Sequence, residues 1–151
     1  MAIGALGGMR KVFDVTLAYA KEREAFGRPI GRLQTIRHKF AEMATRIEAS
    51  RAITYNALRL FATGHDASAD EADPRKVIEA TAGSLREVTM AKLFTQRALL
   101  EVADECLQIH GGYGYMREYG IERAVRDARL GPIGGGTDEV EKEILGRQLG
   151  L

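Results

Sequence analysis

A glycine turn followed by a threonine is the first feature of this 151-residue sequence that could do chemistry. Residues 134–136 are three consecutive glycines, and Thr137 stands where it would cap a following helix. Free N–H groups at a helix N-terminus, beside a hydroxyl and glycines that allow close approach, suit a phosphate or an oxyanion. The alternative is a plain capped turn, because the negative charges of Asp138 and Glu139 disfavour a bare phosphate. No lysine follows the glycines, so the segment is not a P-loop.

A second glycine-rich segment, residues 108–114, reads Gln-Ile-His-Gly-Gly-Tyr-Gly. The side chain of Gln108 and the backbone of Gly111 and Gly112 suit the polar edge of a flat cofactor. The simpler interpretation is a pair of glycines that ends a helix. The residues alone leave both interpretations open.

A third segment, residues 23–29, reads Arg-Glu-Ala-Phe-Gly-Arg-Pro. Arg23 could pair with a phosphate, and Phe26 could stack on a ring system. Without a ligand, Arg23 would instead complement the negative end of a helix, and Phe26 would fill the core. This segment is therefore a candidate site only in combination with the other two.

Several other kinds of chemistry are excluded by residue counts and spacings. Cys106 is the only cysteine, so there is no disulfide and no cysteine-rich zinc site. It lies on an apolar helical stripe, which predicts a core thiol and not a nucleophile. His38, His65 and His110 have no metal-ligand spacing, and we expect no metal site.

Charge and hydropathy exclude two further classes of protein. The 22 Lys and Arg against 21 Asp and Glu leave a formal net charge of +1, which excludes a broadly basic nucleic-acid-binding protein. No run of ~18 apolar residues exists, and the N-terminus lacks the pattern of a signal peptide. We therefore expect a soluble, cytoplasmic protein with neither a membrane nor a nucleic acid as its partner.

Helical periodicity runs through most of the chain, and no stretch alternates polar and apolar residues for long enough to form a strand. A turn over 26–31 and a loop over 64–73 are expected from their glycine, proline and polar residues. Helices are predicted over 3–23, 33–63, 74–109 and 118–129, with a final helix after Thr137. A helix of ~30 residues is a rod ~45 Å long, so the prediction is an all-α bundle of long helices.

Taken in order, these segments resemble one family, the C-terminal domain of the acyl-CoA dehydrogenases. The resemblance covers residues 1–151. It implies an up-down four-helix bundle with a short extra C-terminal helix, the last of three domains in an FAD-dependent enzyme. The N-terminal α and middle β domains would lie outside this chain, and the enzyme would be a homo-oligomer, a dimer or a tetramer. The resemblance rests on residues 19–30, Gln34, 108–115, 126–129 and 136–140.

The resemblance also implies a reaction and a set of contacts. The family removes a proton from the α-carbon and a hydride from the β-carbon of an acyl-CoA thioester, and passes electrons on to an electron-transfer flavoprotein. A carboxylate base and donors to the thioester oxygen are needed. Thr137 and Glu139 would contact the FAD of their own subunit, and Gly135 would offer its N–H to the substrate. The other implied FAD contacts, several of them to the neighbouring subunit's FAD, are Arg23, Phe26, Gln34, Gln108, Gly111 and Gly112.

The chain departs from the commonest members of the family at Gly135, where they carry the catalytic glutamate. Isovaleryl-CoA and long-chain types also have a small residue there and take their base from the first helix. That glutamate would fall just before Met1, so we expect no catalytic residue in this chain and no activity from the chain alone. The competing hypothesis is a non-catalytic assembly module that oligomerises or docks to a partner chain through its long amphipathic faces.

Overall fold

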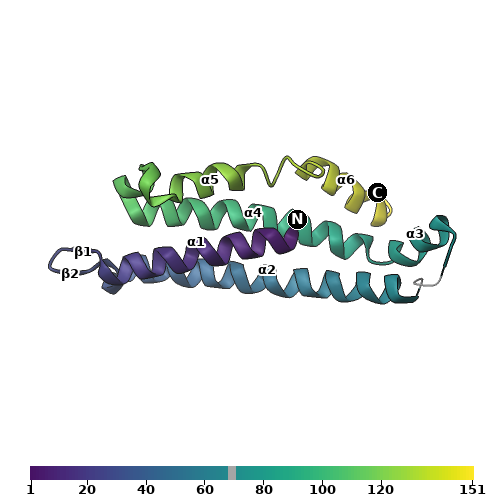
Figure 1. Ribbon diagram of the computed structural model, residues 1–151, viewed down its shortest axis with the longest axis horizontal. Coiled ribbons are helices and arrows are strands. Elements are labelled where there is room, and N and C mark those ends of the chain that lie inside the picture. The colour runs from purple at the N-terminus through teal and green to yellow at the C-terminus, as the bar shows by residue number, and fades with distance from the viewer. Residues whose placement is uncertain (68–70) are drawn as a thin grey trace.

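The computed structural model describes the backbone of residues 1–67 and 71–151 as a bundle of antiparallel helices. Three long helices run in alternating directions, and two short helices follow one another along the fourth position of the bundle (Figure 1). The helices are α1 (Ala2–Glu22), α2 (Gln34–Ala67), α3 (Pro74–Ala82), α4 (Leu85–His110), α5 (Ile121–Arg129) and α6 (Asp138–Gln148). The predicted all-α, up-down bundle is confirmed.

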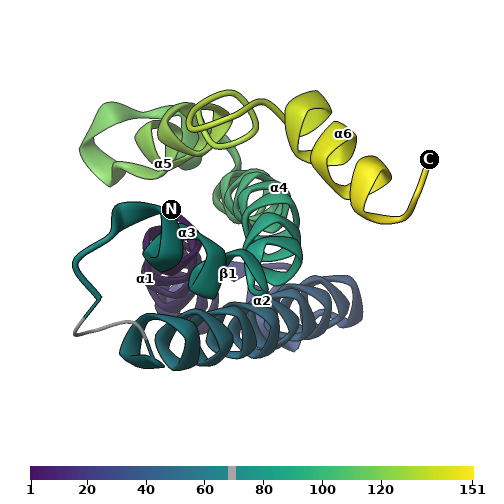
Figure 2. The same ribbon diagram turned by 90° about the vertical axis from the view of Figure 1, so that its right-hand side faces the viewer.

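Helix α4 is the centre of the molecule. Helices α1 and α2 pack on one side of it and α5 and α6 on the other (Figure 2). The core between α1, α2 and α4 contains Met9, Met43, Val102 and Cys106, which are at most 1% exposed. The covered faces of α4 carry its buried residues, whereas Phe94, Arg97, Glu101 and Asp104 stay exposed along its middle.

One predicted helix is wrong: the stretch 74–109 is two helices and not one. Helix α3 ends at Gly83, and both the N–H and the hydroxyl of Ser84 donate to the carbonyl oxygen of Thr81, at 3.0 and 2.7 Å. At Gly64 of α2, an added Cβ would lie 2.4 Å from the backbone oxygen of Ala80, so α3 folds back against that helix. The expected loop over 64–73 starts late, because α2 continues to Ala67, and its residues 68–70 lie outside the described part of the chain.

A small hairpin, which periodicity did not predict, joins α1 to α2. Strands β1 (Glu24–Ala25) and β2 (Arg28–Pro29) pair antiparallel. They are joined by Phe26 and Gly27, whose φ angles are 55° and 73°. Two positive φ angles in a two-residue connection match the twist of a hairpin. Strands of two residues are too short to show an alternating pattern, which is why the expectation of no strand was wrong.

The remaining differences are short turns at helix ends. The predicted helix over 118–129 begins at Ile121, because Gly120 has a φ of 69° and interrupts the chain before it. The 3₁₀ turns are η1 (Ile30–Arg32), η2 (Gly111–Tyr115) and η3 (Arg117–Tyr119). Turns η2 and η3 connect the end of α4 to α5 and bring several aromatic rings to one end of the bundle.

The Cys106 thiol is fully buried, as predicted, and burial raises its pKa to about 11. The folded state holds this proton more tightly than the unfolded chain, so folding stability falls as the pH rises from about 9 to about 11. We expect urea denaturation to show this decline, and the Cys106→Ala variant to show a smaller one. A thiol reagent at pH 8 should label the native protein only as fast as it unfolds. Rapid labelling of the native protein would contradict the burial of this thiol.

Candidate functional site

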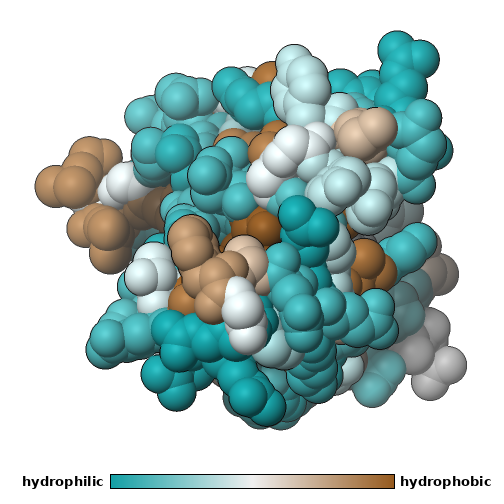
Figure 3. Space-filling view, turned by 90° about the vertical axis from the view of Figure 1, so that its left-hand side faces the viewer, coloured by the Kyte–Doolittle hydropathy of each residue, from teal (hydrophilic) through white to brown (hydrophobic). Residues whose placement is uncertain are grey.

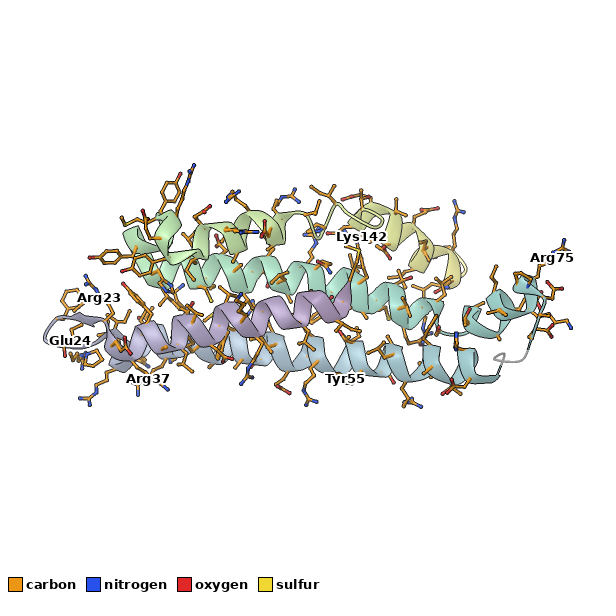
Figure 4. The ribbon with its side chains drawn as sticks, in the orientation of Figure 1. Arg23, Glu24, Arg37, Tyr55, Arg75 and Lys142 are labelled. Carbon is orange, nitrogen blue, oxygen red and sulfur yellow. The ribbon has the colours of Figure 1, made fainter. Side chains whose placement is uncertain are left out.

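Arg23 is held rigidly at the junction of α1 and the hairpin. Its N–H donates to the Tyr19 carbonyl at 2.8 Å, and its own carbonyl accepts the Ile30 N–H at 2.8 Å. The guanidinium lies 5.3 Å from the centre of the Tyr113 ring, a cation–π contact between the end of α1 and the turn after α4. Figure 4 shows Arg23 at the hairpin end of the bundle. The predicted phosphate-binding residue therefore has its side chain beside an aromatic face.

Aromatic side chains surround the end of α4 next to Arg23. The buried His110 ring is stacked on Tyr19, with centroids 4.2 Å apart, and its Nδ1 lies 2.8 Å from the Cys106 carbonyl oxygen. Tyr119 contacts both rings edge-on. Burial raises the pKa of Tyr19, against the smaller opposite effect of the Arg23 charge. His110 is thus fixed in a stack of rings, and sequence spacing gave no sign of that role.

Gly111 and Gly112 leave the backbone bare at this end of α4. Gly111 has a φ of 60° and ends the helix, with its N–H bonded to the carbonyls of Leu107 and Gln108. A Cβ added at Gly111 or Gly112 would meet no atom within 4 Å, so nothing in this chain requires glycine at Gly112 for space. The helix-cap interpretation holds for Gly111, and both glycines face open space that a ligand can approach.

These groups line a groove of about 510 Å³ between the end of α1, the turn η1 and the turn after α4. Figure 3 looks onto this end of the molecule, where hydrophobic groups are exposed among hydrophilic ones. A guanidinium, aromatic faces and open backbone together suit a flat ring system that carries phosphate. The walls of the groove include Tyr19, Arg23, His110, Gly111, Gly112 and Tyr113.

Three other predicted residues lie at the same end without lining the groove. Phe26 is at the hairpin tip and is 90% exposed, so the alternative of a core phenylalanine is wrong. Gln34 begins α2 and is exposed, and Gln108 is exposed on the last turn of α4. The structure therefore gathers six predicted residues at one end of the bundle but brings only Arg23, Gly111 and Gly112 into one groove.

The glycine turn before α6 forms a second cluster. The Thr137 hydroxyl accepts the Val140 N–H at 3.4 Å, which confirms the predicted N-cap. Gly135 and Gly136 have φ angles of 64° and 100°, values that favour glycine. A side chain at Gly135 would also collide with the sulfur of Met1, the residue before α1. The turn therefore requires glycines for its conformation.

Glu139 is exposed beside this turn, whereas Asp138 and Glu141 of the same helix are buried. Its own backbone N–H and the Thr137 hydroxyl lower the pKa of the Glu139 carboxyl. Asp138 is 1% and Glu141 is 7% exposed. The sequence gave no sign of this burial, because its cause is the packing of α6 on α4.

The two clusters lie far apart on the same helix. Lys92 of α4 contacts Gly136 of the turn, and Gly111 caps the other end of α4. At 1.5 Å per residue, the interval from Lys92 to Gly111 spans roughly 28 Å. One small group, such as a single phosphate, cannot contact both clusters in one chain.

Neither a metal centre nor a membrane span accompanies these clusters. Within residues 1–67 and 71–151, no group of three His, Cys, Asp or Glu side chains is placed to hold a metal ion. No helix in the same residues combines the length and apolar character that crossing a membrane requires.

The chain belongs to the acyl-CoA dehydrogenase family, and specifically to its C-terminal domain. Residues 1–150 match the family described as "Acyl-CoA dehydrogenase, C-terminal domain". The mitochondrial long-chain specific acyl-CoA dehydrogenase of Sus scrofa is 39% identical over 96% of this chain. A probable acyl-CoA dehydrogenase of Bacillus subtilis is also 39% identical over 96% of the chain.

Solved structures agree with this assignment. An acyl-CoA dehydrogenase from Geobacillus kaustophilus aligns with 99% of the chain and 35% of its own, at 36% identity and a TM-score of 0.82. The butyryl-CoA dehydrogenase of Megasphaera elsdenii covers 99% of the chain and 35% of its own, at 31% identity and a TM-score of 0.79. The chain spans 30% and 34% of the length of the Sus scrofa and Bacillus subtilis relatives.

Two glycines next to the groove should respond differently to substitution. Gly114 is buried, and a Cβ there would lie 2.7 Å from the Leu107 carbonyl oxygen and 2.9 Å from the His110 Cβ. We expect Gly114→Ala to lower the free energy of unfolding by about 1–3 kcal/mol through overpacking. Gly112→Ala is the matched control and should denature in urea like the wild type. Equal midpoints for the two variants would contradict this packing.

Proposed function

We propose that this chain is the flavin-binding C-terminal domain of an FAD-dependent acyl-CoA dehydrogenase that forms the α,β double bond of an acyl-CoA in fatty acid metabolism. The observation that carries the proposal is the Arg23–Tyr113 stack beside the open backbone of Gly111 and Gly112, in a chain of this family. Bound FAD would accept the hydride from the substrate. The rest of the proposal concerns what the residues of this chain do.

The groove at the hairpin end would hold the adenosine diphosphate part of FAD. The Arg23 guanidinium supplies a positive charge for the pyrophosphate, from a residue whose backbone is hydrogen-bonded on both sides. Phe26, which is exposed at the hairpin tip, would add a ring face. Gln34 and Gln108 are exposed at the same end and offer amide groups to the polar edge of the cofactor.

The glycine turn would serve the reacting end of the molecule. Thr137 and Glu139 are the proposed FAD contacts there, and the Gly135 N–H is the proposed donor to the thioester oxygen, where negative charge develops. Gly135 is exposed and has no side chain to act as a base. We therefore assign no catalytic base among residues 1–151.

The separation of the clusters supports a homo-oligomer, a dimer or a tetramer. Contacts to the adenosine end and to the reacting end lie roughly 28 Å apart along α4. In the proposed arrangement, the Arg23 groove serves the FAD of a neighbouring copy and the glycine turn serves the FAD of its own copy. An electron-transfer flavoprotein is the proposed electron acceptor, and an acyl-CoA is the proposed substrate.

The cytoplasm stays the proposed location, because the single buried thiol suits a reducing compartment. The relative from Sus scrofa is named as a mitochondrial protein.

A second candidate function, an assembly module without catalysis, is favoured by the far end of the bundle. There α2 and α4 extend past the start of α1, and Phe61, Leu85 and Val88 are each more than 40% exposed. They line an apolar groove of about 520 Å³ that reaches Gly135 of the glycine turn. Light scattering after gel filtration separates the flavin-binding domain from the assembly module. An oligomer that binds no flavin would support only the assembly module.

FAD added to the chain, isotopically labelled for NMR, should shift the amide resonances around Arg23, Gly111 and Gly112. Arg23→Ala should raise the Kd for FAD about 10- to 150-fold, the loss of a hydrogen bond to a charged group. Gly112→Ala should also weaken binding while leaving the urea midpoint unchanged, because its methyl group would occupy the space of the ligand.

Arg10→Ala is the control for this titration. Arg10 lies on α1, which Arg23 follows, is exposed, and pairs with Asp14 at 3.2 Å. The Arg10→Ala variant should bind FAD like the wild type. Shifts centred on another groove, or an unchanged Kd for Arg23→Ala, would refute the proposed FAD contacts.

Acyl-CoA oxidation provides a separate prediction. The 151-residue chain, mixed with FAD and an acyl-CoA, should not reduce an artificial electron acceptor, because none of its residues is assigned as the base. The butyryl and isovaleryl thioesters should both be tested. Turnover by the purified chain would show that a residue within it performs the proton abstraction.

A further inference from the structure

The glycine turn before α6 is fastened to α4 by two charged contacts. Lys92 Nζ donates to the carbonyl oxygen of Gly136 and lies 3.7 Å from the carboxylate of Glu141. Arg97, one turn further along α4, pairs with the carboxylate of Asp138. The Lys92 and Glu141 side chains are only 8% and 9% exposed. A lysine that is buried beside a backbone carbonyl needs a reason, because burying an ammonium group is unfavourable.

Ion pairing alone does not account for this lysine. A buried pair can often be replaced by apolar side chains without loss of stability. The distance of 3.7 Å to Glu141 is also long for a direct hydrogen bond. The shorter contact of the Lys92 ammonium is to the Gly136 carbonyl. Lys92 therefore affects the orientation of the Gly136 peptide group in the turn.

The orientation of one peptide group follows from that contact. In a planar trans peptide, the C=O and the following N–H point in opposite directions. Because the Gly136 carbonyl points at Lys92, the Thr137 N–H points to the opposite side. Among the described residues, no acceptor is recorded for the Thr137 N–H. The contact therefore leaves one backbone donor unsatisfied and directed away from the core.

We infer that Lys92 is a positioning residue: it holds the Gly136–Thr137 peptide so that the Thr137 N–H faces a ligand bound at the turn. Gly136, with a φ of 100°, has no side chain to restrict this peptide, so the restriction must come from outside the turn. Lys92 supplies it from the rigid helix α4, and Glu141 keeps the ammonium charge compensated. The identity of the ligand as FAD or substrate rests on the proposed function, whereas the orientation of the peptide does not.

The test uses NMR on the 151-residue chain without FAD, so it is independent of flavin binding. The Asp138 N–H, which donates to the Pro132 carbonyl at 3.0 Å and closes the turn, is the reporter of local opening. In Lys92→Met, we expect its hydrogen exchange to accelerate about tenfold or more relative to the Val102 amide of the core. The carbonyl carbon resonance of Gly136 should move upfield because its hydrogen bond is lost.

A double variant separates positioning from stability. Lys92→Met alone leaves the Glu141 carboxylate buried without a cation, so the melting temperature should fall. Lys92→Met with Glu141→Met removes both charges and should recover much of that loss. The faster Asp138 exchange and the shifted Gly136 carbonyl should persist in the double variant, because methionine has no N–H or O–H group to donate in place of the ammonium.

Lys142→Met is the matched control. Lys142 follows Glu141 in α6, is exposed, and is labelled in Figure 4. The Lys142→Met substitution should leave the melting temperature, the Asp138 exchange and the Gly136 carbonyl resonance unchanged. The inference would be overturned if the double variant recovered the wild-type Asp138 exchange together with its melting temperature. It would also be overturned if neither Lys92 variant changed the Asp138 exchange or the Gly136 carbonyl. Either result would leave Lys92 as an ordinary ion-pair partner.

Discussion

The packing of α4 between two pairs of helices is the constraint from which the other features follow. Helices α1 and α2 cover one side and α5 and α6 the other, so the polar side chains that α4 buries must find partners inside the bundle. Thr95 meets this need within its own helix, where its hydroxyl donates to the Ala91 carbonyl at 2.7 Å. Lys92 meets it by donating to the Gly136 carbonyl in the turn before α6, and the exposed Arg97 pairs with the buried carboxylate of Asp138 in α6. The central helix is therefore the common frame for both clusters.

Periodicity predicted the long helices well, because their apolar stripes are continuous over several turns. It failed where one local interaction interrupts such a stripe. The break at Gly83 depends on the close approach of α3 to Gly64, which is distant along the chain. The hairpin depends on two residues with positive φ, one of them the non-glycine Phe26. Sequence patterns describe repeated environments, whereas these two features each arise from a single contact or turn.

The candidate site was predicted unevenly for a related reason. Exposed residue types that suit a cofactor, such as Arg23 and the glycine pair, are visible in the sequence and lie together in the structure. The Tyr19–His110 stack was missed because its partners are 91 residues apart and have no shared spacing. The contact between Lys92 and the glycine turn was also missed, because Lys92 and Gly136 are 44 residues apart in the sequence.

The hairpin tip shows how stability and recognition can oppose one another in this molecule. Phe26 adopts a left-handed backbone conformation, with a φ of 55°, and leaves its ring 90% exposed. Both features are unfavourable in an isolated chain, by about 1–2 kcal/mol for the backbone alone. A glycine at this position would relax the loop but would remove the ring. The tip is therefore a position where substitutions that improve folding would also erase a surface feature, and thermal screening alone would favour the wrong residue.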